Sequence, residues 1–369
     1  MRGAGDGACR VGGFGQGAAM RSTVRGLLAA LHLAPALLGG AKDGRLDIYW
    51  IDSQGGGSTL IVTPAGESVL IDCGNPGGRD AARIHKVATT VAGLARVDHL
   101  VTTHLHVDHY GGAPELAAMI PIGVLHDNGV PAEDPDGNHD PTWPQRIKAY
   151  REMKVDSREV VQPGDRLALR PGKDTQPKLT VRFVAARRQF GLRTSGVANI
   201  AACQDPNPRP KDTSDNANSV VTLVEFGGFR FFDGGDVTWN VEAGLVCPVT
   251  QVGPVDVFQV NHHGMDASNN PMLLRSLAPR VAVFNNGPTK GCAPAVAAAL
   301  RALPEPPAIY QVHRNKNAPD ANTDAGRIAN ADPEGGRHLM LTVSPDAQRY
   351  TVAVPATGHR FTYLVRPHP

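Results

Sequence analysis

Four side chains that can bind metal ions occur within six residues, in the run His104-Leu105-His106-Val107-Asp108-His109. The run follows an apolar stretch, Val97 to Thr103, that is typical of a buried strand. Alternate residues of an extended chain point the same way, so His104 and His106 can bind one ion together. Asp108 and His109 lie where the chain turns away, and they can reach a second ion. The spacing therefore predicts a metal site.

The ligand types limit both the metal and the chemistry. Imidazole and carboxylate suit Zn²⁺, Mn²⁺ and Fe²⁺, and no cysteine stands among these ligands to narrow the choice. Two such ions about 3.5–4 Å apart share a water, lower its pKa towards neutrality and stabilise charge on a scissile carbonyl or phosphoryl oxygen. We therefore expect two divalent metal ions, zinc first, and a metal-dependent hydrolase. The protein must then supply a proton donor for the leaving group.

The motif resembles the H-x-H-x-D-H signature of the metallo-β-lactamase superfamily, and further blocks follow the order that this family requires. An apolar run ends in Asp72-Cys73-Gly74, and a polar block, Asp215 to Ser219, precedes an apolar hairpin. Gly234-Gly235-Asp236 follows the hairpin, and Asn261-His262-His263-Gly264 follows a later apolar run. The last three blocks are similar to the hydrolase domain of the competence protein ComEC/Rec2. The likeness spans roughly residues 46–312.

The resemblance implies two metal sites that share one carboxylate. The ligands it implies are His104 and His106 for the first metal, Asp108 and His109 for the second, Asp236 between them, and His262 to complete the second, with His263 either the true ligand or a neighbouring proton donor. Asp72 would hydrogen-bond the histidine ligands and fix their orientation. Asp108 also counts among the catalytic residues.

Two departures from the family concern the first metal. Most members have a further histidine between the motif and the bridging aspartate, and the family's Thr-Gly-Asp is Gly-Gly-Asp here. Only His126 and His139 lie in that interval, and neither is expected at a strand end with the usual neighbours. The ComEC-like subgroup has the polar block instead, so we expect Asn216, Asn218 or Ser219 to face the first metal, directly or through water.

The proton donor has two candidates. His263 is the first, because it adjoins the ligand block, and His313, at the end of the apolar run Ala308 to Val312, is the second. Both would lie at strand ends, where the metal ligands are also expected.

Three functions stay open. The first is hydrolysis of phosphodiesters such as single-stranded DNA or nucleotides, and the second is hydrolysis of amides or esters, including lactones and β-lactams. The third is non-catalytic binding of a metal or ligand. A basic cluster distinguishes the first two: near the metals it would favour phosphodiesters, whereas a solvated loop is its more ordinary interpretation. Its members are Arg187, Arg188, Arg193, Arg209 and Lys211.

Composition fits an ordinary hydrolase. The chain of 369 residues is 41% hydrophobic, and its formal net charge is +2. That charge is too small for a dedicated nucleic-acid-binding domain, so we expect a small-molecule or nucleic-acid substrate but no stable nucleic-acid complex. The sequence leaves the oligomeric state open. Cys73 should lie near the metals without binding them, and one disulfide is possible among the later cysteines.

The amino-terminal region is expected to lie outside the folded domain. Residues 1–19 are rich in glycine and alanine, which predicts a disordered or spurious extension. Residues 20–41 have arginines, a short apolar core and small residues at the end, which is typical of a secretory signal peptide. This predicts a periplasmic or secreted protein with a hydrolase domain at 42–369. No later stretch approaches the length of a membrane span.

Within that domain the pattern predicts an α/β fold. Apolar runs predict strands, and amphipathic segments predict helices at 79–95, 114–119, 144–153, 271–277 and 293–303. The expected strands are 46–52, 59–63, 68–72, 97–103, 179–185, 220–226, 229–232, 255–260, 281–285, 308–312 and a closing hairpin at 339–343 and 350–354. Such an order suits the αββα sandwich of the metallo-β-lactamase superfamily, two mixed sheets with helices on the outer faces.

Overall fold

A computed structural model describes residues 43–191, 198–204 and 207–367. The description below concerns one compact unit, Leu38–Pro369. The extension predicted at 1–19 and the signal peptide predicted at 20–41 lie outside the described residues. Within the described part, no helix has the length and apolar character needed to cross a membrane.

One sheet carries the motif strand. Its strands are β1 (Leu46–Trp50), β2 (Thr59–Val62), β3 (Ser68–Ile71), β4 (Val97–Val101), β5 (Ile122–Asp127), β6 (Ser157–Val160), β15 (Leu339–Val343), β16 (Arg349–Val354) and β17 (His359–Leu364). They pair in the order β17-β16-β15-β1-β2-β3-β4-β5-β6. From β3 to β6 the strands are parallel, and the other pairs are antiparallel. The sheet is therefore mixed, and β4 is an interior strand of its parallel half.

The second sheet carries the later blocks. Its strands are β7 (Leu179–Ala186), β8 (Gln189–Phe190), β9 (Val221–Phe226), β10 (Phe229–Asp233), β11 (Val257–Gln259), β12 (Val281–Phe284), β13 (Ala308–His313) and β14 (Ile328–Asn330). They pair in the order β14-β13-β12-β11-β10-β9-β7-β8. The strands from β10 to β14 are parallel, whereas β9 pairs antiparallel with both β10 and β7.

The two sheets pack face to face around one apolar core. Trp50 of β1 meets Phe231 of β10 edge-on, with ring centroids 5.8 Å apart. The Trp50 indole also donates to Gln259 Oε1 of β11 at 2.8 Å, so its buried N–H is satisfied. A second core lies on the far side of the second sheet, where leucines 273, 274 and 277 pack against Phe258 and Phe284.

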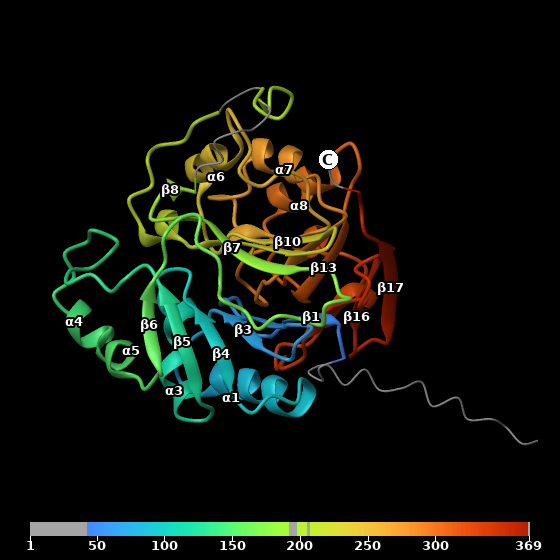
Figure 1. The fold of residues 1–369 in the computed structure, drawn as a ribbon. Helices are drawn as coiled ribbons and strands as arrows, with labels where there is room; N and C mark the ends of the chain where they lie inside the picture. The colour runs from blue at the N-terminus through green and yellow to red at the C-terminus, as the bar shows by residue number, and fades with distance from the viewer. Residues whose placement is uncertain (1–42, 192–197, 205–206, 368–369) are drawn as a thin grey trace, which may run out of the picture. The chain divides into compact units, whose positions relative to one another are not determined.

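Helices cover the outer faces. Figure 1 shows α1 (Arg79–Lys86) and α3 (Ala113–Ala117) outside the first sheet, and α6 (Trp239–Val246), α7 (Pro271–Leu277) and α8 (Pro294–Arg301) outside the second. Shorter helices α2 (Val107–Tyr110), α4 (Trp143–Arg146) and α5 (Lys148–Glu152) lie in the connections. The predicted αββα sandwich of two mixed sheets is confirmed.

Some predicted elements have different bounds. The helix predicted at 79–95 ends as α1 and continues as a π-helical turn, Val87–Val91, in a β-branched stretch where Thr89 Oγ1 donates to His85 O. The helix predicted at 144–153 is two short helices, α4 and α5. The closing hairpin gains a third strand, β17, which was not predicted although Phe361 and Tyr363 alternate with polar residues.

A disulfide joins Cys203 to Cys247, with Cα atoms 5.7 Å apart, while Cys73 and Cys292 are free and buried. The sequence separation is 44 residues. We expect the Cys203→Ala/Cys247→Ala double variant to lose about 4 kcal/mol of unfolding free energy, because the bridge restricts the unfolded chain. Urea unfolding with and without reductant measures this. The double variant should not respond to reductant, and equal stability of oxidised wild type and variant would contradict the expectation.

Candidate metal centre

Three strand ends bring the candidate ligands together. The histidine motif follows β4, Asp236 follows β10, and the His262-His263 pair follows β11. The sheets meet at this end, where Val220 N donates to Thr103 O at 2.8 Å. Carboxyl ends of neighbouring strands are a common place for functional groups, because the loops that follow converge there.

Four side chains form a compact group. One ligand atom from each of Asp108, His109, Asp236 and His263 lies within 4.8 Å of all the others. His109 Nε2 lies 3.2 Å from Asp236 Oδ2 and 3.2 Å from His263 Nε2. His263 Nε2 is 3.4 Å from Asp108 Oδ2 and 3.3 Å from Asp236 Oδ2. Two imidazoles and two carboxylates at these separations match a four-ligand site for a divalent ion.

The hydrogen bonds of His104, His109 and His263 leave Nε2 of each ring free for a metal. His109 Nδ1 donates to Asp72 Oδ2 at 2.7 Å, and His263 Nδ1 donates to Asn285 O at 3.0 Å. Thr103 Oγ1 donates to Asp72 Oδ2 and therefore accepts from His104 Nδ1 at 3.0 Å. His104 Nε2 is buried and has no hydrogen-bond partner among the described residues. Such tautomers are those of metal-binding histidines, so the residues present fit a metal.

Charges in the group are arranged for a cation. Burial alone would raise the pKa of Asp236, but His109, His263 and His262 hold that pKa well below its ordinary value. Burial would lower the pKa of His109, but Asp236, Asp72 and Asp108 raise it well above the usual range. The carboxylate of Asp236 is thus favoured in its ionised form, in which it can bind a metal ion.

Asp72 lies where the resemblance implies, behind the motif. Its Oδ1 accepts from Thr103 N at 2.8 Å, and its Oδ2 faces His109. Asp72 has a positive φ of 61°, which Asp and Asn tolerate better than most residues. Gly57 packs against both side chains: a Cβ there would come within 2.7 Å of Asp72 Oδ2 and 2.8 Å of His109 Nδ1. The backbone at Gly57 thus packs closely against Asp72 and His109 and helps to hold them, and only glycine leaves room for this contact.

The structure separates His262 from His263. His263 belongs to the compact group, whereas His262 has Nδ1 3.1 Å from Ser268 Oγ and Nε2 3.5 Å from Asp236 Oδ2. This geometry favours His263 as the ligand of the Asp108–His109 site. His263 thus takes the position of a ligand, one of the two roles predicted for it, with Nδ1 bonded to Asn285 O and Nε2 directed into the group.

The first metal's ligands are less compact. The rings of His104 and His106 lie 4.6 Å apart, but His106 Nε2 donates to Asp136 Oδ1 at 2.8 Å. Burial alone would lower the pKa of His106, but the hydrogen bond to Asp136 raises that pKa above its ordinary value. Asp136, from the loop after β5, is an acidic partner that the sequence analysis missed, since nothing in its local sequence marks it.

The polar block supports the centre from behind. Ser219 Oγ accepts from Asp236 N at 3.2 Å, and Asn218 Nδ2 donates to Asp215 Oδ1 at 2.9 Å. Asp215 Oδ2 in turn accepts from Leu105 N at 2.6 Å, inside the motif. Asn216 Oδ1 is buried without a partner among the described residues. The contacts of Asn218 and Ser219 therefore position the motif and Asp236.

Two histidines of the interval lie away from the motif. His126 is the next-to-last residue of β5, which corrects the expectation that it stands at no strand end. Its ring nitrogens face His99 at 3.1 Å and Glu159 at 3.4 Å. His139 is exposed in the loop that follows. Neither contributes to the compact group.

Lys290 is a further residue that sequence reasoning missed. Its ammonium group forms a hydrogen-bonded ion pair with Asp108 Oδ2, across 182 residues of sequence. It follows β12, so no motif places it near the ligands. Its side chain is 37% exposed, which puts a cation at the accessible side of the centre.

His313 has a different setting from the one predicted. Its Nε2 donates to Asp52 Oδ1 at 2.6 Å, and Asp52 Oδ2 pairs with Arg83 at 2.9 Å. The pair is buried, with side-chain exposures of 1% and 0%. None of its described contacts reaches the four-ligand group, and its role as proton donor stays a prediction.

We expect Asp52→Asn to lower the unfolding free energy at pH 7 by about 3 kcal/mol, because it leaves the partners of a buried ion pair uncompensated. Burial alone would raise the pKa of Asp52, but the hydrogen bond and charge of His313 lower that pKa below its ordinary 3.8. A depressed carboxyl pKa stabilises the fold above that ordinary value and loses its contribution as pH falls through the folded pKa. Urea unfolding from pH 7 to pH 3 should show the two proteins converging below about pH 4. A constant difference over that range would contradict this assignment.

A cleft runs beside the motif. A cavity of about 420 Å³ is lined by Leu105, Asn128, Pro131, Arg187, Asp215 and Asn218, among others. Arg187 lies in this cleft, where Nη1 donates to Asn128 Oδ1 at 3.4 Å. Arg188, Arg209 and Lys211 line a separate pocket, and Arg193 lies outside the described residues.

Comparison with known proteins agrees with this geometry. A family model described as the metallo-beta-lactamase superfamily matches residues 53–180, roughly a third of the chain. A UPF0173 metal-dependent hydrolase of Polynucleobacter asymbioticus is 35% identical over 98 residues, which cover 25% of this chain and 33% of that protein. One of Cupriavidus metallidurans is 30% identical over 99 residues, covering 26% and 31%. The chain thus spans about a third of the length of these relatives.

Solved structures resemble the chain more broadly and more weakly. The metallo-beta-lactamase fold protein YhfI of Bacillus subtilis is 10% identical with a TM-score of 0.41, covering 72% of this chain and 96% of that one. Zn(2+)-bound PqqB of Methylobacterium extorquens is 14% identical with a TM-score of 0.40, covering 72% and 97%. Neither likeness is strong enough to bear on function. Residues 53–180 thus carry the sequence pattern of the metallo-beta-lactamase superfamily, on a fold of two mixed β-sheets with helices on their outer faces.

Proposed function

We propose that this protein is a metal-dependent hydrolase that acts on phosphodiesters. The observation that carries the hydrolase proposal is the convergence of Asp108, His109, Asp236 and His263, from three separate strand ends, on one compact group. A matched segment in two proteins named metal-dependent hydrolases supports it.

Each residue has a distinct part in the proposed centre. His109 and His263 would hold one ion through Nε2 together with Asp108, and His104 and His106 would hold a second, with Asp236 between them. When bound, the ions supply Lewis acidity and lower the pKa of a water. Asp72 keeps the His109 ring in the orientation and tautomer that expose Nε2. Ser219 fixes the backbone at Asp236.

Basic groups beside the centre support a phosphodiester substrate. Arg187 lines the cleft that Leu105 of the motif also lines, and Lys290 pairs with Asp108. Guanidinium and ammonium groups bind phosphate oxygens through charge-assisted hydrogen bonds. A neutral lactone or ester offers no anionic oxygen of this kind, and a β-lactam offers a single carboxylate. The surroundings therefore favour phosphodiesters over amides and esters.

Metal content together with turnover tests this function. We expect about two zinc, manganese or iron ions per chain by elemental analysis, and hydrolysis of bis-p-nitrophenyl phosphate but not of nitrocefin. An Asp320→Asn variant, which changes an exposed aspartate of another loop, should match the wild type. Hydrolysis of nitrocefin without hydrolysis of bis-p-nitrophenyl phosphate would indicate an amide hydrolase instead. One ion or none, without turnover, would indicate a binding protein instead.

We also propose that the protein is periplasmic or secreted, as residues 20–41 predict. The Cys203–Cys247 disulfide supports this, because such bonds persist mainly in oxidising compartments. Fractionation of cells that express the full chain, with immunodetection, tests the proposal. Protein confined to the cytoplasm would contradict it.

A further inference from the structure

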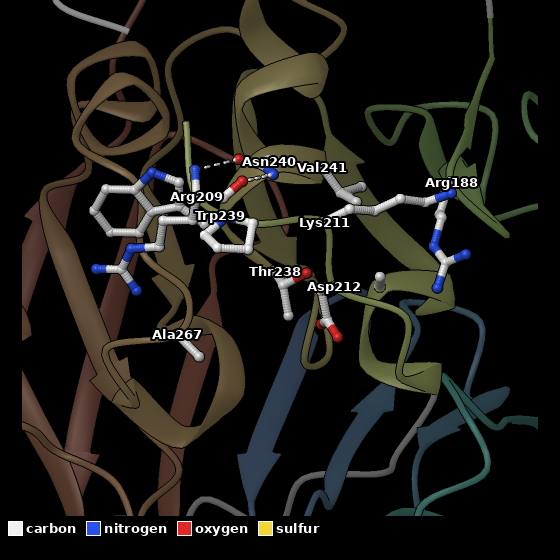
Figure 2. Close-up of a pocket in the computed structure, with 11 residues that line it drawn as sticks. Arg188, Arg209, Lys211, Asp212, Thr238, Trp239, Asn240, Val241 and Ala267 are labelled. Carbon is white, nitrogen blue, oxygen red and sulfur yellow. Dashed lines mark hydrogen bonds between the residues drawn. The ribbon is translucent and has the colours of Figure 1, made fainter. Parts of the chain in front are cut away.

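A second pocket lies under the loop that carries Arg209 and Lys211. It has a volume of about 260 Å³ and is open on one side. Figure 2 shows Arg188, Arg209, Lys211 and Asp212 around it, with Trp239 and Val241 from the first turn of α6. Apolar surface comes from Trp239 and Val241, so the pocket combines an aromatic wall with three cations and one carboxylate. None of the residues described above as metal ligands lines it.

The pocket adjoins the metal centre. Thr238 lines it two residues after Asp236, and Ala217 lines it two residues before Ser219, which holds the Asp236 backbone. Ala267 lines it next to Ser268, whose Oγ is 3.1 Å from His262 Nδ1. In sequence, each of these three wall residues thus lies one or two positions from Asp236 or from a serine that contacts Asp236 or His262. The pocket and the centre are therefore built from the same three chain segments.

The loop over the pocket is held in place. Arg209 N donates to Asn240 Oδ1 at 3.0 Å, and Asn240 Nδ2 donates to Arg209 O at 2.7 Å. The Arg209 guanidinium also lies over the Trp239 ring, 3.7 Å from its centroid. Trp239 Nε1 donates to Asn207 O at 2.7 Å. These contacts fix the loop to α6 and hold the Arg209 guanidinium in place.

Several donors in the pocket remain available. Arg188 Nε is buried without a partner among the described residues, although its Nη2 donates to Ser214 O at 3.1 Å. The Lys211 ammonium makes no hydrogen bond or ion pair within the described chain. Asp212 Oδ1 already accepts from Ser214 N at 2.9 Å. The pocket also lies at the amino end of α6, where backbone N–H groups and the helix dipole favour an anion.

We propose that this pocket binds a second phosphate of the substrate, beyond the bond that is cleaved at the metal centre. The inference rests on the proposed phosphodiester hydrolysis and narrows its substrate to one that carries an additional phosphate near the scissile group. Lys211 and Arg188 contact that phosphate, and the Trp239 wall covers the adjoining apolar part. The preferred substrate is therefore a phosphorylated nucleotide or short oligonucleotide end.

Three related substrates test this assignment. Thymidine dinucleotide is compared with the same dinucleotide carrying a phosphate on its 5′ end and, separately, on its 3′ end. We expect wild type to favour one phosphorylated form by about tenfold in kcat/KM, mostly through KM, which corresponds to one charge-assisted contact. The Lys211→Gln and Arg188→Gln variants should each lose most of this preference. The matched control is Lys154→Gln, an exposed lysine after α5, which should keep it. An unchanged preference in both pocket variants, or none in wild type, overturns the assignment.

Tryptophan fluorescence tests the pocket without turnover. Trp50 and Trp143 are buried, so Trp239 is the one partly exposed tryptophan of the three in the chain. Inorganic phosphate should change the emission of the metal-loaded protein in a saturable way, with several-fold weaker binding in Lys211→Gln and no response in Trp239→Phe. A response that persists in Trp239→Phe overturns the pocket. A Trp239 response in a protein that cleaves no dinucleotide supports the pocket and overturns the phosphodiesterase function instead.

Discussion

Asp236→Asn is expected to remove metal from the centre and to lower kcat on bis-p-nitrophenyl phosphate by at least about 10³-fold. Asp236 Oδ2 lies 3.2 Å from His109 Nε2 and 3.3 Å from His263 Nε2. The amide has almost the same shape, but it lacks the negative charge that these histidines stabilise. The loss should therefore appear in metal content and turnover together, whereas the fold is retained.

Elemental analysis, circular dichroism and steady-state kinetics on the same preparation separate these effects. The control is Asp320→Asn, which makes the same chemical change at an exposed site. Asp236→Asn protein that is folded and still holds its full metal complement would show that the carboxylate is not a ligand.

Asp72→Asn is expected to weaken metal binding by about 10–100-fold, although Asp72 is not a ligand in this account. The carboxylate accepts from His109 Nδ1 at 2.7 Å and so leaves Nε2 unprotonated and correctly directed. Asparagine tolerates the positive φ of 61° at this position, so the backbone need not change. Its neutral amide is a poorer acceptor, and the ring loses orientation and basicity.

Competition with a chelating dye measures this change in affinity. A purely structural role of Asp72 would lower the melting temperature of metal-free protein and leave the affinity of the surviving folded fraction intact. We expect the reverse: a clear loss of affinity, with similar far-ultraviolet circular dichroism. Wild-type affinity in the variant would contradict the positioning role.

The part of the site that sequence predicted is the part with local spacing. His104, His106, Asp108 and His109 lie in one run, whose residue types and spacing mark it without any long-range information. Asp236 could be predicted as a ligand only from the resemblance to the family. Its position after β10 indicates a ligand only once β10 and β4 are known to end at the same place. The same holds for the His262-His263 pair, and only the three-dimensional structure separates its two members.

Other contacts left no signal in the sequence. Asp136 reaches His106 across 30 residues, and Lys290 reaches Asp108 across 182, both from loops without a fixed motif. His313 ends an apolar strand as expected, but Asp52 and Arg83 form the buried network around it. Long-range charge pairing of this kind depends on which strands become neighbours, and local pattern does not encode it.

The fold was predictable where strands are apolar. β9, β10 and β12 are almost wholly buried, and their apolar runs predicted them to within two residues. β6 is an edge strand with exposed side chains, and neither alternation nor apolarity marked it. β17, the other edge strand, has Phe361 and Tyr363 alternating with polar residues, a signal that the prediction left unused. β5 begins with a mostly apolar run, but a histidine and an aspartate at its end obscured it.

Anomalous diffraction at the absorption edge of the bound metal, from crystals of the full chain, tests the central claim most directly. The account predicts one peak about 2.0–2.2 Å from Nε2 of His109 and of His263 and beside Asp108 and Asp236. It predicts a second peak about 3.5–4 Å away, next to His104 and His106. Metal-loaded crystals with no peak at these residues, or with a peak held by other side chains, would contradict it.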